Sequence, residues 1–121
     1  MSPRLRTLLG VLTAWDLGIG IWALFAPTSL ESALGLAHAP DPWVRFVGLL
    51  WVFVACIQFR AMASNLGLFS ESFWFSMLFR VMEGAMCIAS AFLAPSLRVL
   101  CWVLAVTNMG LVVLEWRWAK S

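Results

Sequence analysis

Four long apolar segments occupy almost the whole of this 121-residue chain. They run over Thr7–Ala26, Trp43–Met62, Phe73–Leu93 and Leu97–Trp118, and each has about the 20 residues that a helix needs to cross the hydrocarbon core of a bilayer. Hydrophobic residues make up 63% of the chain and charged residues 12%, whereas a soluble domain is roughly half apolar and about a quarter charged. The sequence therefore predicts an all-α integral membrane protein, a single four-transmembrane-helix bundle over residues 1–121.

The distribution of lysine and arginine predicts how this bundle is oriented. Four crossings place both chain ends on the same side of the membrane. That side carries five cations, whereas the opposite side carries two: Arg4, Arg6, Arg60, Arg117 and Lys120 against Arg45 and Arg98. Because an excess of lysine and arginine marks the cytoplasmic face, we expect both termini in the cytoplasm. The net charge of +2 is dispersed along the chain and gives no basic patch for nucleic acid.

The longest connection, Pro27–Pro42, reads PTSLESALGLAHAPDP. Thr28 and Glu31 have the spacing of a capping box, and apolar residues then recur on one helical face as far as Ala37. We expect a short interfacial helix between transmembrane helices 1 and 2, ended by the prolines that follow it. A lid over a pocket is the functional alternative, and a simple connector is the interpretation we favour.

Residues that bind metals or cofactors are few and scattered. The only histidine, His38, falls in the connection beside prolines, and the three cysteines show no CxxC spacing. A zinc site needs several such ligands together, and cysteines inside apolar helices usually act as small buried hydrophobes. We therefore predict no cofactor, no metal site and no catalytic residue.

Polar residues inside the apolar segments follow helical periodicity. In the third segment they all lie on one stripe, which consists of Ser72, Ser76, Arg80, Glu83, Cys87 and Ser90 and ends at Ala94. Asp16 lies on a seam of small residues in the first segment, and Asn108 and Glu115 lie on one stripe of the fourth. Polar and small residues in membrane helices prefer one another to lipid, so the three stripes should face each other. The second segment has no charge or amide from Phe46 to Ile57 and should pack through Gly48 and Ala55.

Asp16, Arg80, Glu83 and Asn108 all lie near the middle of their segments and are the predicted buried polar cluster. A lone charge at the bilayer centre costs at least about 3 kcal/mol, so pairing is expected. Arg80 can compensate one carboxylate, and desolvation then favours the protonated form of the other. A carboxyl that takes up and releases a proton suits a proton-coupled device, whereas one that stays neutral suits a structural role. We favour the structural role.

The segments Asp16–Leu30 and Glu83–Leu97 resemble each other. DLGIGIWALFAPTSL and EGAMCIASAFLAPSL each have a central acid, a nearby glycine, and an Ala-Pro at the helix exit followed by Ser and Leu. One residue of insertion is needed for the alignment. The similarity predicts two helical hairpins in parallel, an arrangement found in transporters that does not by itself imply transport.

Three stretches together, LGIGIWALFAPTSLESALGL, DPWVRFVGLLWVFVA and LFRVMEGAMCIASAFLA, resemble the small bacterial four-helix membrane proteins grouped as DoxX-like. The likeness includes the proline that ends the first helix, the Arg-x-x-Gly that opens the second and the central arginine of the third. It implies a four-helix bundle in the bacterial cytoplasmic membrane, often an accessory of a larger membrane or redox assembly. It implies no particular catalytic residue.

Three classes of function remain open. The first is a non-catalytic accessory or structural subunit that contacts membrane lipids, other membrane-protein subunits or copies of itself, with the aromatic stretch Phe69–Phe79 as a docking surface. The second is a small proton-coupled transporter that uses Asp16 or Glu83. The third is an enzyme acting on a lipid or quinone through one of these acids, which no histidine or nucleophile arrangement supports. We favour the first class.

Overall fold

Four long helices make up most of the computed structural model, which describes residues 1–36 and 39–120. They are α1 (Pro3–Phe25), α3 (Asp41–Ser64), α4 (Glu71–Leu93) and α5 (Arg98–Ala119). Three short helices connect them: α2 (Pro27–Leu34), η1 (Gly67–Phe69) and η2 (Pro95–Leu97). The prediction of an all-α chain with four long apolar helices is confirmed, because the described residues form no strand and four helices are long and apolar enough to cross a membrane.

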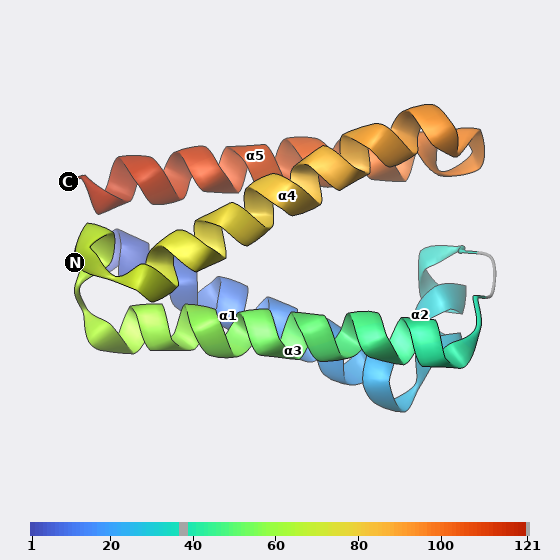
Figure 1. Cartoon of the computed structure of the whole chain (residues 1–121), viewed down its shortest axis with the longest axis horizontal. Coiled ribbons are helices and arrows are strands. Elements are labelled where there is room, and N and C mark those ends of the chain that lie inside the picture. Colours follow the sequence, from blue (N-terminus) through green and yellow to red (C-terminus); the bar gives the residue numbers. More distant parts are fainter. Residues whose placement is uncertain (37–38, 121) are drawn as a thin grey trace.

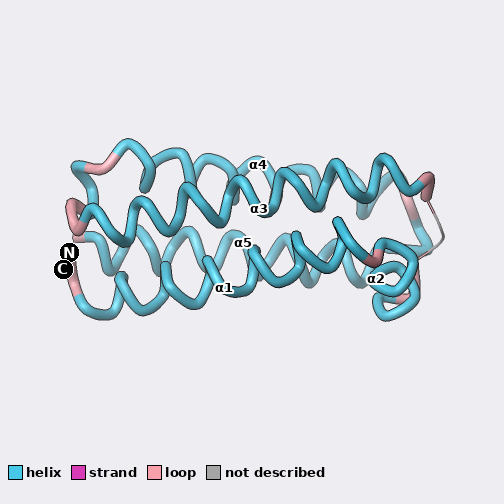
Figure 2. Tube along the Cα trace, turned by 90° about the horizontal axis from the view of Figure 1, so that it is seen from below, coloured by secondary structure: helices cyan, strands magenta, loops and turns pink. Residues whose placement is uncertain are grey.

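The long helices form two hairpins that lie side by side. α1 packs mainly on α3, α4 packs mainly on α5, and α3 contacts α4 between the two hairpins. Figures 1 and 2 place the N- and C-termini together at one end of the bundle, which we call the terminal end. The two chain ends are joined there, because the Ser2 hydroxyl donates a 2.9 Å hydrogen bond to the Trp118 carbonyl.

The helix ends follow from local sequence. Ser2 and Ser70 are the N-caps of α1 and α4, where their hydroxyls accept hydrogen bonds from the backbone N–H groups of Leu5 and Phe73 and satisfy donors that have no partner within the helix. At the far ends, α1 and α4 each stop at an alanine that precedes a proline. A proline disfavours helical backbone angles in the residue before it, so Pro27 and Pro95 start new elements.

The connection after α1 contains a helix, but its predicted limits are wrong. α2 begins at Pro27 with Ala26 as its N-cap and no capping side chain, so Thr28 and Glu31 form no capping box. The helix stops at Gly35, whose φ of 68° is left-handed, a conformation that favours glycine and closes helices. Glu31 instead accepts a 2.8 Å hydrogen bond from the Ala39 backbone. His38 lies outside the described residues.

α1 and α3 approach closely enough for their backbones to touch. A Cβ placed on Gly20 would lie 2.8 Å from the Gly48 carbonyl oxygen, and one placed on Gly48 would lie 2.7 Å from the Gly20 carbonyl oxygen. Glycine permits this contact because it has no side chain in the way. Ala55, further along α3, is also buried. The prediction that this helix packs through Gly48 and Ala55 is confirmed.

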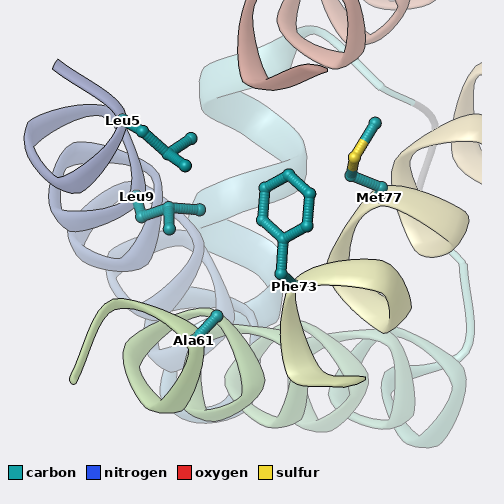
Figure 3. Packing of buried hydrophobic residues seen from close by; sticks show 5 residues of the cluster. All are labelled: Leu5, Leu9, Ala61, Phe73 and Met77. Atoms are coloured by element: carbon teal, nitrogen blue, oxygen red, sulfur yellow. The ribbon is translucent and has the colours of Figure 1, made fainter. Parts of the chain in front are cut away.

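The apolar core is small and lies at the terminal end. It consists of Leu5, Leu9, Ala61, Phe73 and Met77, which come from α1, α3 and α4. Figure 3 shows the Phe73 ring between the side chains of α1 and the Met77 side chain. This cluster holds the start of α4 against the first hairpin.

Away from that core, the distribution of polarity is the reverse of that in a soluble domain. Large apolar side chains point outward, and Phe69, Leu93 and Phe25 are 89%, 84% and 79% exposed. Six polar side chains are buried between the helices instead: Asp16, Gln58, Ser76, Arg80, Asn108 and Glu115. Such an exterior matches a hydrocarbon solvent.

Candidate functional site

The centre of the bundle is organised by Arg80 of α4, which is 4% exposed. One terminal guanidinium nitrogen, Nη2, lies 2.9 Å from Oδ2 of Asp16 and donates a hydrogen bond to it. The other, Nη1, donates a 3.4 Å hydrogen bond to Oδ1 of Asn108. The inner nitrogen, Nε, lies 3.4 Å from Oε1 of Glu115. Arg80 therefore connects α4 to α1 on one side and to α5 on the other.

Helix geometry explains why these residues meet. Asn108 and Glu115 are seven residues apart in α5, which places them on the same face two turns apart. Asp16 comes from the face of α1 that also carries buried Gly20. The planar guanidinium has five donors arranged in a fork, so one side chain can contact partners on two other helices. Asn108 is itself fixed in orientation, because its Nδ2 donates a 2.9 Å hydrogen bond to the Leu104 carbonyl.

Of the four residues in the predicted cluster, the structure brings Asp16, Arg80 and Asn108 into contact. Glu83 is half-buried at the edge of the cluster, near Asn108, and among the described residues the ion pairs of Arg80 go to Asp16 and Glu115 instead. Long side chains in a helix point back toward its N-terminus. Arg80 therefore leans away from Glu83, one turn further along α4, and toward the terminal end, where Glu115 lies.

The predicted cluster of four residues did not include three further polar residues that are buried around Arg80. Glu115 is 0% exposed, and the periodicity places it on the same inward stripe as Asn108, just as it places Ser76 on the stripe of Arg80. Gln58 is also 0% exposed and directly follows the apolar stretch Phe46–Ile57. It lies beside Asp16, yet neither of its amide atoms has a partner at hydrogen-bond geometry within the described chain. Ser76, one turn before Arg80, has a buried hydroxyl that also lacks a hydrogen-bond partner within the described chain.

The charges of this site do not balance when both carboxylates are ionised. Arg80 supplies one positive charge, and Asp16 and Glu115 could supply two negative charges, all in residues no more than 5% exposed. Burying an uncompensated charge costs several kcal/mol. Asp16 has the shorter contact and a well-formed hydrogen bond, whereas neither Glu115 oxygen has a hydrogen-bond partner in the described chain. Asp16 is therefore the main counter-ion of Arg80, and Glu115 is the surplus acid.

This difference gives a testable prediction on stability. Asp16→Asn should lower the melting temperature of the detergent-solubilised protein more than Glu115→Gln, because only the first change removes the principal counter-ion of a buried cation, a loss of about 3 kcal/mol or more. Glu115→Gln keeps the shape of the side chain and removes only the surplus acid. Each variant is the control for the other in thermal unfolding followed by tryptophan fluorescence. A larger loss for Glu115→Gln would reverse the assignment.

Side chains that could bind a metal ion are not clustered in the part of the chain that the structure describes. Among residues 1–36 and 39–120, no group of three or more His, Cys, Asp or Glu side chains is arranged to hold a metal ion. The Arg80 site can hold charged groups and fix the positions of the helices that it joins, and its acids can hold or release protons.

Comparison with known proteins found no relative of this chain. No protein-family model matches the chain, and neither a curated protein nor a solved structure shows significant similarity to it.

Proposed function

We propose that this chain is an integral protein of a bacterial cytoplasmic membrane with both termini in the cytoplasm and α2 lying at the opposite surface. The four apolar helices and the outward-facing large apolar side chains support the location. The cation excess at the terminal end supports the orientation. The two cations of the other end are engaged by helix ends, since Arg45 donates to the Leu24 carbonyl and Arg98 to the Ala91 carbonyl.

Location and orientation have a direct test. The protein should stay in the membrane pellet after an alkaline carbonate wash. A single cysteine placed at Ser2, on a background without the native cysteines, should react with a membrane-impermeant maleimide only after the cells are opened. A cysteine at Ser29 of α2 should react in intact cells. Release by carbonate would contradict the location, and the opposite labelling pattern would contradict the orientation.

Within that membrane, we propose that the protein is a non-catalytic accessory or structural subunit that binds lipids, other membrane proteins or copies of itself. The observation that supports this most is the Arg80 network, because a buried guanidinium contacting three other side chains on two helices favours a fixed helix arrangement. A rigid bundle with an apolar exterior is suited to docking. The resemblance to DoxX-like proteins is consistent with such a role.

Native mass spectrometry after gentle extraction from the source membrane tests this proposal. Release together with other subunits is the expected result. A stable homo-oligomer would also support the proposal, because it is a subunit bound to copies of itself. A monomer that carries neither protein partners nor lipid would contradict an accessory role. Extraction of the Arg80→Leu variant beside the wild type would show whether the network is needed for the assembly.

A proton-coupled transporter is the second candidate, and the row of buried polar side chains from the terminal end to the middle of the bundle favours it. Counting about 1.5 Å per residue from the terminal end of each helix, Glu115 lies about 6 Å deep and Asp16 about 20 Å deep, with Arg80 between them. Two acids sharing one guanidinium could exchange a proton. In liposomes with an imposed pH gradient, the wild type should then dissipate the gradient, and Asp16→Asn should reduce the rate at least tenfold. Rates equal to those of empty liposomes would exclude this function.

A further inference from the structure

A groove runs along the outer side of the α3–α4 contact, starting at the terminal end. Its first part is a cavity of about 630 Å³ at the point where α3 ends and α4 begins. A second cavity of about 280 Å³ continues it deeper into the bundle. The two cavities share three wall residues, Phe53, Ile57 and Phe75, so they lie next to each other along the same α3–α4 contact.

The mouth of this groove contains polar side chains among apolar ones and carries both signs of charge. Arg60 of α3 and Glu71 of α4 line it together with serines from both helices, Ser64, Ser70 and Ser72. Arg60 and Glu71 are exposed, and neither takes part in an ion pair within the part of the chain that the structure describes. Two unpaired groups of opposite charge at one cavity favour a ligand that itself carries both charges.

Below the mouth, the walls are apolar. Apart from Ser76, the deeper cavity is lined by hydrophobic side chains that include Leu50 and Met82. Leu50 is ten residues before Arg60, and Met82 is eleven residues after Glu71. At about 1.5 Å per residue, both residues lie roughly 15 Å below the charged mouth, which is about half of a 30 Å hydrocarbon core. The groove is thus as deep as one leaflet.

We propose that this groove binds one zwitterionic, amine-bearing phospholipid from the leaflet at the terminal end. The phosphate lies against Arg60, whose guanidinium suits phosphate geometry. The ammonium group lies against Glu71, and an acyl chain follows the apolar wall from Phe53 to Leu50. This inference rests on the membrane location proposed above and specifies which lipid the subunit holds.

The hydroxyl of Ser76 gives a second, independent indication that the groove binds a ligand. It lines the deeper cavity and is 1% exposed, and its hydroxyl has no hydrogen-bond partner in the described chain. Buried hydroxyls normally have a partner. Ser76 follows Glu71 by five residues, which places it about 7 Å below the headgroup position. That is the depth of the ester carbonyls of a phospholipid, and rotation about the Cα–Cβ bond would let the hydroxyl donate to one of them.

Charge also separates this ligand from other occupants. A purely anionic headgroup would meet the Glu71 carboxylate, which repels it. A helix of a partner protein would bring an apolar face to a mouth that carries the two charges of Arg60 and Glu71, and would bury both of them without partners. A zwitterionic headgroup satisfies both charges at once, and a primary ammonium also donates N–H hydrogen bonds to Glu71, which the trimethylammonium of a choline headgroup cannot do.

The test is lipid selectivity of the delipidated, detergent-solubilised protein by native mass spectrometry. Equal amounts of dioleoyl phosphatidylethanolamine, phosphatidylcholine and phosphatidylglycerol are added in competition. Phosphatidylethanolamine should be retained most by the wild type. Glu71→Gln should lower the preference for phosphatidylethanolamine over phosphatidylglycerol about fivefold, because a partly exposed charge pair contributes on the order of 1 kcal/mol. Arg60→Gln should reduce retention of all three lipids.

Arg117→Gln is the matched control, because Arg117 is an exposed cation of the terminal end that does not line the groove. It should leave the selectivity unchanged. Equal retention of the three lipids by the wild type, or an unchanged preference in Glu71→Gln, would overturn the proposal. Preference for phosphatidylglycerol would overturn the zwitterionic occupant in the same way. Release from the membrane by carbonate is a separate result that refutes the location and not the selectivity.

Discussion

Replacing Arg80 with leucine should destabilise the protein more than any other single change in the polar core. Leucine retains the aliphatic part of the side chain only as far as Cδ, and the substitution leaves Asp16 and Glu115, which are 2% and 0% exposed, without a cation. Removing one partner of a buried ion pair typically costs about 3–5 kcal/mol. We expect a sharply lower yield in the membrane and a melting temperature in detergent lower by many degrees.

Two further variants make the result interpretable. Arg117→Leu removes an exposed cation and should leave the melting temperature within a degree or two of the wild type. Combining Arg80→Leu with Asp16→Asn and Glu115→Gln removes all three charges together, so it should recover part of the lost stability. A fully stable Arg80→Leu protein would show that the network does not hold the bundle together. Failure of the triple variant to recover would show that the contacts matter more than the charge balance.

The second large effect should come from adding a single methyl group at Gly20. A Cβ there would lie 2.8 Å from the Gly48 carbonyl oxygen and 2.9 Å from the Val52 backbone nitrogen. Both are backbone atoms that cannot rotate away, so Gly20→Ala must push α1 and α3 apart. Overpacking of this kind costs about 1–3 kcal/mol, despite the higher helix propensity of alanine.

Gly18→Ala is the matched control for Gly20→Ala. Gly18 lies in the same helix, only two residues away, and a Cβ on it would have no neighbour within 4 Å. Its replacement should be neutral or stabilising by up to about 1 kcal/mol, which is the helix propensity difference between alanine and glycine. Equal melting temperatures for the two variants, measured by tryptophan fluorescence, would contradict the close approach of α1 and α3.

Hydrophobic patterning was sufficient to locate the four long helices. A mainly apolar run of about 20 residues has few alternatives to a helix, which satisfies its backbone hydrogen bonds within itself. The small-residue positions Gly48 and Ala55 could also be assigned to the helix contact, because glycine and alanine in such a run have a packing role. Local chemistry was less informative for α2, where a left-handed glycine at position 35 ended the helix before the prolines that the sequence offered as its stop.

The polar core, too, could be predicted from the sequence only in part. Periodicity alone put Asp16, Arg80 and Asn108 on inward faces, since 3.6 residues per turn determines which positions share a side of a helix. Which acid pairs with Arg80 depended on the direction in which that long side chain leans and on how far α5 is shifted along α4. Those are properties of packed helices, so only the tertiary structure selected Glu115 over Glu83, placed Gln58 beside Asp16 and created the α3–α4 groove. The sequence specifies which face of each helix carries the polar residues. How deep each of these residues lies in the bundle, and which residue it bonds, are decided when the helices pack against each other.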